Sequence, residues 1–243
     1  MTRLFHVSDL HFGRADQDAL DWFAGLVEAE RPDAVICTGD LTMRARSAEF
    51  EAAARWLEAL PVPVTVEPGN HDLPYFNPFE RMFRPYRRFG RVQKMIERPI
   101  DLDGVTVIPL RTTARAQLRH NWSWGVVNEK SLRRAVEMAS GSTAGHVKLV
   151  AAHHPLIDKT GVEGRAKTRR GLSALKALAE AGADAVLTGH VHDPFDITHD
   201  MAGRAIRMIG AGTLSERVRG SRPSFNELHV AEGALQVIVR VLD

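Results

Sequence analysis

The 243-residue sequence is poor in cysteine and in long apolar runs. Its one cysteine, Cys37, cannot form an internal disulfide, so a disulfide-stabilised scaffold is excluded and a reducing, cytoplasmic setting is expected. No stretch approaches the roughly 18 consecutive apolar residues that a membrane-spanning helix needs. The apolar residues Leu4–Val7 predict a strand at the start of the chain, so we expect neither a signal peptide nor a membrane span.

The sequence also lacks an excess of either charge. The net charge is +2, and no long like-charged tail, internal repeat or low-complexity tract is present. Hydrophobic and charged fractions of 44% and 26% are typical of a globular protein. Positive charge gathers in three short runs, at residues 80–91, 164–171 and 216–222. Each run is either solvated surface or part of a positive rim that attracts an anionic substrate.

Apolar runs along the chain predict nine strands, and apolar residues at three-and-four spacing predict four helices. The expected strands are 4–7, 34–38, 62–66, 105–110, 147–152, 185–188, 205–209, 225–230 and 235–242, and the expected helices are 16–30, 47–60, 128–139 and 171–182. Alternating strands and helices in the first half predict parallel strands under helical cover. The last three strands follow one another closely, which predicts an antiparallel meander or a second sheet. We expect an α/β fold with two facing sheets and outer helices, as a single domain over residues 1–243.

Residues 73–98 differ from the rest of the chain. They are rich in aromatic and basic residues, and Pro74, Pro78 and Pro85 divide them into short pieces. This composition predicts a lid-like excursion of short helices rather than a core element.

Five of the expected strands end in residues that can bind a metal. Asp9 and His11 follow the first strand, and side chains two residues apart project from the same face of an extended chain. The other groups are Gly39-Asp40, Gly69-Asn70-His71-Asp72, His153-His154 and Gly189-His190-Val191-His192. In open α/β sheets, ligands bind beyond the carboxyl ends of the strands. Each group alone is explained as a turn, a helix cap or a core histidine. Five of the eleven histidines nevertheless lie at these strand ends, namely His11, His71, His153, His190 and His192. The joint pattern predicts a metal centre.

The ordered motifs Asp-x-His, Gly-Asp, Gly-Asn-His-Asp, His and Gly-His-x-His resemble those of the calcineurin-like metallophosphoesterases. They run from residue 9 to residue 192 with every position filled. The resemblance implies a four-layer αββα sandwich of two mixed β-sheets flanked by helices, in agreement with the order of elements. It also implies two metal ions, one held by Asp9, His11, Asp40 and His192, and one held by Asp40, Asn70, His153 and His190. Asp40 would bridge the two ions, and His153 is preferred to its neighbour His154 because of the family's His-x-Pro spacing.

Oxygen and nitrogen ligands without thiolate suit two divalent ions such as Mn, Fe, Zn or Co. A hydroxide held between two such ions would attack phosphorus in line. His71 is predicted to be a catalytic proton donor or an electrostatic partner of the leaving oxygen. Asp72 either orients His71 or caps a helix.

The motifs "SDLHFG", "AHHPL" and "GHVH" resemble most the bacterial branch that contains class III cyclic-nucleotide phosphodiesterases and glycerophosphodiesterases. We therefore expect a phosphodiesterase that acts on a small anionic phosphodiester, with the cyclic-nucleotide type favoured. Segments 73–91, 111–125 and 158–171 are expected to select the substrate. The candidate substrate-binding residues are Arg84, Arg88, Arg111 and His154. Aromatic residues near Arg84 would stack on a base or cover a lipid chain, or would simply pack a small lid core.

Three alternatives stay open at this point. A pyrophosphatase of the UDP-diacylglucosamine hydrolase type would be favoured by an exposed apolar groove beside the metals. A nuclease would need a basic track several phosphates long, which argues against a nucleic-acid substrate. A non-catalytic scaffold would have a degraded metal site, whereas every ligand position is filled here. The natural substrate, the metal pair and the oligomeric state, a homodimer included, are left open by the sequence.

Overall fold

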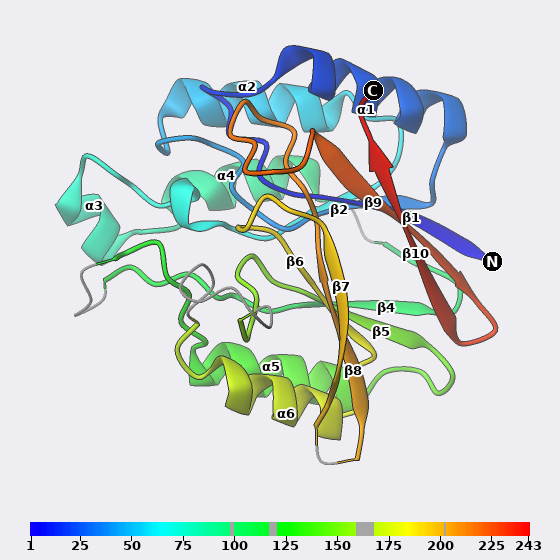
Figure 1. The fold of residues 1–243 in the computed structure, drawn as a ribbon. Helices are drawn as coiled ribbons and strands as arrows, with labels where there is room; N and C mark the ends of the chain where they lie inside the picture. The colour runs from blue at the N-terminus through cyan, green and yellow to red at the C-terminus, as the bar shows by residue number, and fades with distance from the viewer. Residues whose placement is uncertain (98–99, 117–120, 159–167, 202) are drawn as a thin grey trace.

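The computed structural model describes residues 1–97, 100–116, 121–158, 168–201 and 203–243, and it contains two five-stranded sheets that face each other (Figure 1). The first sheet has the strand order β10-β9-β1-β2-β3. Its strands are β1 (Thr2–Val7), β2 (Ala34–Cys37), β3 (Val64–Val66), β9 (Ser224–Ala231) and β10 (Ala234–Val241). β1, β2 and β3 run parallel, and β9 pairs antiparallel with both β1 and β10. The carboxyl ends of these three parallel strands therefore lie side by side at the same end of the sheet.

The second sheet has the strand order β4-β5-β6-β8-β7. Its strands are β4 (Val105–Pro109), β5 (Val147–Ala151), β6 (Ala185–Thr188), β7 (Phe195–Asp200) and β8 (Ala205–Gly210). β4, β5, β6 and β8 run parallel, and β7 is antiparallel to β8.

Helices cover both outer faces of the sandwich (Figure 1). They are α1 (Gln17–Glu30), α2 (Ser47–Glu58), α3 (Pro78–Phe83), α4 (Arg87–Ile96), α5 (Glu129–Ser140) and α6 (Gly171–Glu180), with a short 3-10 turn at η1 (Asn70–Asp72). Local sequence explains where two of them begin. The Asp16 side chain accepts from the Ala19 N–H at the start of α1, and Asn128 caps α5 in the same way. No helix in the described part of the chain is long and apolar enough to cross a membrane.

Three apolar cores hold the four layers together. One lies between the first sheet and the helices α1, α2 and α4, and it contains Phe5, Phe23 and Phe225. A second lies between the two sheets, where Leu4 packs in the same cluster as Leu187. The third joins the second sheet to α5 and α6. Alternate residues of β1 thus face different cores, because side chains alternate across a strand.

The predicted α/β sandwich of two mixed sheets flanked by helices is confirmed by this architecture. All nine expected strands are present, but β7 was not expected, because its sequence "FDITHD" alternates buried with exposed residues and contains no apolar run. The last three expected strands also do not form one meander. β8 joins the second sheet in parallel with β6, while β9 and β10 form a hairpin on the first sheet.

Residues 73–98 contain the short helices that their prolines predicted, but the two helices differ in packing. α4 contributes Phe89, Val92 and Ile96 to the core, so the expectation that no part of this segment is a core element is wrong for α4. α3 extends away from the sheets (Figure 1), with Phe79 73% exposed and Phe83 65% exposed. Only the part around α3 keeps the character of an excursion.

Candidate metal centre

The residues predicted to bind metal meet at the carboxyl ends of strands from both sheets. Asp9 and His11 follow β1, Asp40 follows β2, and Asn70 begins η1 after β3. From the second sheet, β5 delivers His153 and β6 delivers His190 and His192. Backbone hydrogen bonds tie these exits to one another, with Asp9 N–H donating to Gly39 and Gly189 N–H donating to His153. Parallel strands thus place side chains that are far apart in sequence beside one another.

Asp9, His11 and His192 form one candidate ligand group. Their potential ligand atoms lie within 4.8 Å of one another, and all three residues are buried. The Asp9 Oδ1 lies 3.0 Å from the His192 Nε2 and 3.5 Å from the His11 Nε2. The two Nε2 atoms lie 3.3 Å apart.

The hydrogen bonds of the two imidazoles show which atoms carry protons. The His11 Nδ1 faces the carbonyl of Thr42, and the His192 Nδ1 faces the carbonyl of Arg217. Because a carbonyl oxygen only accepts, each Nδ1 carries the proton and each Nε2 presents its lone pair. The Asp9 Oδ1 is also buried without a hydrogen-bond partner. Three electron-pair donors therefore converge on one point, which is the arrangement that a divalent cation requires.

Asp40, Asn70, His153 and His190 surround a neighbouring point. The Asp40 Oδ2 lies 3.4 Å from the His153 Nε2 and 3.7 Å from the His11 Nε2, so its carboxylate stands between the two groups. The His153 Nε2 lies 3.2 Å from the Asn70 Oδ1. Its Nδ1 donates to the carbonyl of Thr38 at 2.8 Å. Burial lowers the pKa of His153, but Asp40, Asp9 and the Thr38 carbonyl together raise it to about 9, so a metal ion would have to displace the Nε2 proton.

The adjacent histidines His153 and His154 have different environments. Both ring nitrogens of His154 have hydrogen-bond partners outside the metal groups, the Thr112 hydroxyl at 2.9 Å and the Ser123 carbonyl at 2.9 Å. The His154 ring also packs against His190, with ring centroids 4.6 Å apart. His154 is thus placed to support the site, and His153 is the one whose Nε2 faces Asp40 and Asn70.

Burial and the neighbouring charges set the protonation of these groups. Burial raises the pKa of Asp40, but His153, His71 and His11 together hold that pKa well below its usual range. Burial likewise raises the pKa of Asp9, but His192, His11 and His153 together hold it well below its usual range. Burial lowers the pKa of His190 to about 3. Anionic carboxylates and a neutral imidazole are the forms that bind metals.

The backbone of the site is strained. Asp9, His11, Asp40, His190 and His192 all have positive φ, between 45° and 69°. Left-handed backbone costs a residue with a side chain roughly 1 kcal/mol or more, and such residues concentrate at functional sites. The left-handed backbone of these five residues directs their side chains into the site.

Two glycines allow the close approach of segments in the site. A Cβ added at Gly69 would lie 2.0 Å from the Asp40 Oδ1. A Cβ added at Gly189 would lie 1.8 Å from the Ser8 Oγ and 2.4 Å from the Asp9 Oδ2. Any larger residue at either position would displace a candidate ligand.

His71 lies at the edge of the metal groups. Its Nδ1 donates to the carbonyl of Met43 at 2.7 Å, so its Nε2 is directed to the site, where it accepts from the Arg217 Nη1 at 3.2 Å. Asp72 does not orient the His71 ring. Its carboxylate accepts from the N–H groups of Leu41, Thr42 and Gly69 and from the Thr42 hydroxyl. Asp72 therefore fastens the loop after β2 to the loop after β3.

A small cavity of about 210 Å³ opens over these residues. Among the described residues, its lining includes Asp40, Asn70, His71, His190 and His192, together with Asn121, Ser123, Trp124, Arg217 and Arg219. The Arg217 Nη1 also lies 3.1 Å from the His11 Nε2. The sequence analysis identified residues 216–222 only as a basic run. That run is the sequence feature that could have indicated a role for Arg217 at the site.

The arginines predicted to bind substrate lie elsewhere. Arg84 is exposed at the end of α3, and Arg88 pairs with Glu80 at 2.7 Å and donates to the carbonyl of Ala45. Arg111 stacks on the ring of Tyr86, 4.2 Å from its centroid, and lines a different, larger cavity. Of the segments expected to select substrate, residues 117–120 and 159–167 lie outside the described part of the chain.

Comparisons with known proteins agree with this geometry. The sequence model described as calcineurin-like phosphoesterase matches residues 2–194. The chain is 35% identical over 82 residues to the glycerophosphodiester phosphodiesterase GpdQ of Enterobacter lignolyticus (strain SCF1), covering 28% of this chain and 29% of that protein. It is 25% identical over 218 residues to one of the subunits of the nuclease SbcCD of Staphylococcus epidermidis (strain ATCC 12228 / FDA PCI 1200), covering 81% of this chain and 58% of that protein. The chain thus matches less than two thirds of the length of either relative.

Solved structures with the same fold include a dimetal phosphatase from Danio rerio, with a TM-score of 0.72, 14% identity, and coverage of 99% of this chain and 96% of that one. TT1561 of Thermus thermophilus matches with a TM-score of 0.60, 15% identity and 97% coverage of both chains. At these identities the two structures establish a shared fold.

Proposed function

The chain belongs to the calcineurin-like phosphoesterases, and from that premise we propose that it is a metal-dependent phosphoester hydrolase acting on a small phosphodiester. The cyclic-nucleotide type is favoured among small phosphodiesters. The cavity of about 210 Å³ at the metal groups supports a compact substrate, and the lone buried thiol of Cys37 supports a cytoplasmic setting.

The convergence of unprotonated donor atoms carries the proposal. The Nε2 lone pairs of His11 and His192 and the unpartnered Asp9 Oδ1 face one another, and the Asp40 carboxylate stands beside them. The Arg217 Nη1 donates to the His11 Nε2 at 3.1 Å, but the Asp9 Oδ1 is left without a donor. A buried acceptor of this kind is unfavourable unless a cation lies beside it. The donor set therefore fits the two-metal assignment made from the motifs.

The proposed first ion is held by Asp9, His11, Asp40 and His192. The second is held by Asp40, Asn70, His153 and His190. When bound, two such ions activate a water molecule and neutralise charge on the phosphoryl oxygens. Mn, Fe, Zn and Co all suit this mixture of oxygen and nitrogen donors.

The side chains around the ions supply the remaining functions. Arg217 and Arg219 line the cavity and would bind non-bridging oxygens of the phosphodiester. His71 is held by the Met43 carbonyl with its Nε2 toward the cavity, from which a protonated ring would give its Nε2 proton to the leaving oxygen. Trp124 offers a flat apolar surface to a base.

The test begins with metal content and then measures hydrolysis of an aryl phosphodiester with Mn and other divalent ions. A panel of cyclic nucleotides, glycerophosphodiesters and UDP-lipids follows. Asp40→Ala and Asn70→Ala should abolish turnover, whereas Glu58→Gln on the exposed face of α2 should leave it unchanged. Full activity in Asp40→Ala would refute the two-metal assignment.

The exposed aromatics around α3 favour a second candidate, a pyrophosphatase acting on a nucleotide-linked lipid. Tyr75, Phe76, Phe79 and Phe83 are each more than 60% exposed, so they do not pack a lid core of their own. Arg81 stacks over Trp122, which is next to cavity residues Asn121 and Ser123. We propose that this excursion acts as a lid over an amphiphilic substrate. Faster turnover of UDP-lipids than of cyclic nucleotides, lost in Phe79→Ser/Phe83→Ser, would favour this candidate over the first.

A further inference from the structure

A second, larger cavity of about 1280 Å³ lies between the free edges of the two sheets. β3 forms the edge of the first sheet and β4 the edge of the second, and residues of both strands line this cavity. α4, α5 and the segment after β4 contribute the other walls. Among the described residues, it shares no lining residue with the smaller cavity at the metal groups.

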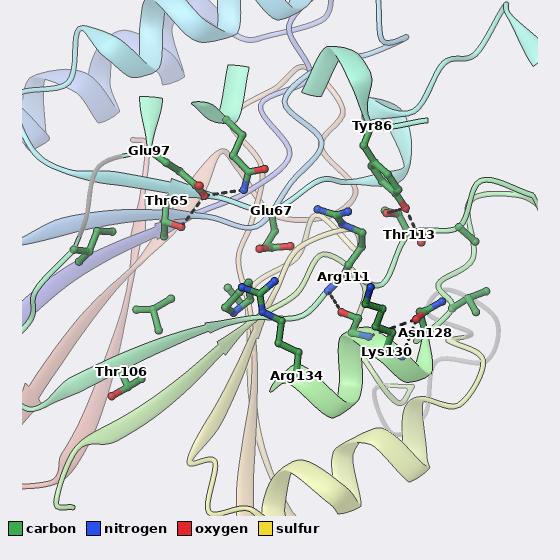
Figure 2. Close-up of a pocket in the computed structure, with 18 of the residues that line it drawn as sticks. Thr65, Glu67, Tyr86, Glu97, Thr106, Arg111, Thr113, Asn128, Lys130 and Arg134 are labelled. Atoms are coloured by element: carbon green, nitrogen blue, oxygen red, sulfur yellow. Dashed lines mark hydrogen bonds between the residues drawn. The ribbon is translucent and has the colours of Figure 1, made fainter. Parts of the chain in front are cut away.

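The two walls of this cavity carry opposite charges. Glu67, directly after β3, and Glu97, at the end of α4, lie on the side of the first sheet. Arg111, after β4, and Lys130 and Arg134 of α5 lie on the side of the second sheet. Figure 2 shows Glu67, Arg111 and Arg134 projecting into the same space between the sheets.

Glu67 is the buried member of this group, and its carboxyl group has no partner in the described part of the chain. The residue is only 6% exposed, and its carboxyl group makes no hydrogen bond or ion pair with the residues that the structure describes. Burial raises the pKa of Glu67 to about 8, and the nearby Arg111 only partly offsets this effect. A buried acid without a partner is costly, and a ligand that donated hydrogen bonds to it would remove that cost.

The cationic wall is also without carboxylate partners. Arg111, Lys130 and Arg134 form no ion pair with any carboxylate in the described ranges. The Arg111 guanidinium lies against the Tyr86 ring instead of pairing with Glu67, and its Nε is buried without a hydrogen-bond partner. Three positive charges thus lie along one wall of the hollow without forming an ion pair with Glu67 or Glu97 on the opposite wall.

We propose that this cavity is a second binding site, separate from the metal centre, for a ligand that joins an anionic group to a pair of adjacent N–H donors. The anionic group binds Arg111, Lys130 and Arg134, and the two N–H groups bind the Glu67 carboxylate side by side. A guanine nucleotide has this chemistry, with a phosphate and the N–H edge of its base. Free arginine has it as well, with a carboxylate and a guanidinium group.

Calorimetric titration of the metal-loaded protein with guanosine 5′-monophosphate and with L-arginine tests the proposal. It also shows which of these two ligands the cavity binds. Ribose 5-phosphate, which has the phosphate without the N–H pair, should bind at least about tenfold more weakly than the nucleotide. Glu67→Gln and Arg134→Gln should each lower the affinity for whichever of the two ligands binds by about tenfold or more. Arg133→Gln is the matched control, because Arg133 neighbours Arg134 on α5 without lining the cavity.

A third variant, Asp40→Asn, distinguishes this site from the metal centre. Binding should persist in Asp40→Asn, and aryl phosphodiester hydrolysis should persist in Arg134→Gln. Binding that is lost in Asp40→Asn but kept in Glu67→Gln and Arg134→Gln would place the ligand at the metal centre and overturn the proposal. The proposal would also be overturned if neither guanosine 5′-monophosphate nor L-arginine bound, or if ribose 5-phosphate bound as tightly as the nucleotide. Arg134 is exposed on a helix, so its substitution does not threaten the fold.

Discussion

Replacing Glu67 by Gln should make the protein more stable at neutral and alkaline pH. Burial raises the pKa of the Glu67 carboxyl from 4.5 to about 8, with Arg111 lowering it and Glu97 raising it. Between these values the folded protein holds a proton that the unfolded chain has released. The folded state binds more protons, so the contribution of Glu67 to the free energy of unfolding falls as pH rises through this window. Gln has the same shape and does not titrate.

The size of the effect follows from the two pKa values. Each unit of pKa difference corresponds to about 1.4 kcal/mol, so the contribution of Glu67 falls by roughly 3 kcal/mol between about pH 5 and about pH 7.5. Its carboxyl faces a cavity that water can enter, and hydration of the charged form reduces the effect. We therefore expect wild-type protein to lose about 1–3 kcal/mol relative to Glu67→Gln across that interval.

Urea denaturation at a series of pH values, without added nucleotide or arginine, measures this difference. Other titrating groups contribute equally to both proteins and cancel in the comparison. Glu58→Gln, on the exposed surface of α2, is the control and should follow the wild type at every pH. If the free energies of wild type and Glu67→Gln run parallel over the interval, the carboxyl is not desolvated and the reasoning is refuted.

Three further predictions concern the metal centre and the excursion. His71→Ala should lower kcat by about 10²-fold or more while leaving two metals bound, measured by steady-state kinetics and elemental analysis; loss of metal would contradict the assigned role. Arg217→Gln should raise KM for an aryl phosphodiester by about tenfold, because it removes a cation from the cavity, whereas Arg14→Gln on the exposed surface should not. Phe89→Ala should destabilise the protein by about 3–5 kcal/mol in urea denaturation, and Phe79→Ala by less than about 0.5 kcal/mol; equal losses would show that α3 packs as α4 does.

The sequence was most informative where local pattern and topology agree. Each candidate ligand follows an apolar strand, and strands that alternate with helices are parallel, so their ends had to meet. Asp9 and His11 could therefore be assigned to one site from the sequence alone. The edge strand β7 could not be predicted, because half of its residues face solvent and the apolar signal disappears.

The contacts of individual side chains could not be predicted in the same way, because the pattern of strands and helices does not determine them. Arg88 and Arg217 both lie in basic runs, and nothing in composition distinguishes them. Tertiary packing directs Arg88 to Glu80, while the loop between β8 and β9 brings Arg217 to His11 and His71. The cavity at Glu67 was equally hidden, since it depends on where the edges of two sheets stand relative to each other.

Backbone strain and ligand geometry in the metal centre are two aspects of one arrangement. Five candidate ligands have left-handed backbone, at a cost of roughly 1 kcal/mol each, which is a large part of the 5–15 kcal/mol by which a typical domain is stable. The same residues bring the lone pairs of His11 and His192 to 3.3 Å, which adds repulsion. Both costs are offset together when positive charge lies between the ligands. Metal binding should therefore stabilise the fold as well as supply the chemistry, and thermal unfolding with and without a chelator should show a higher Tm for the metal-loaded protein.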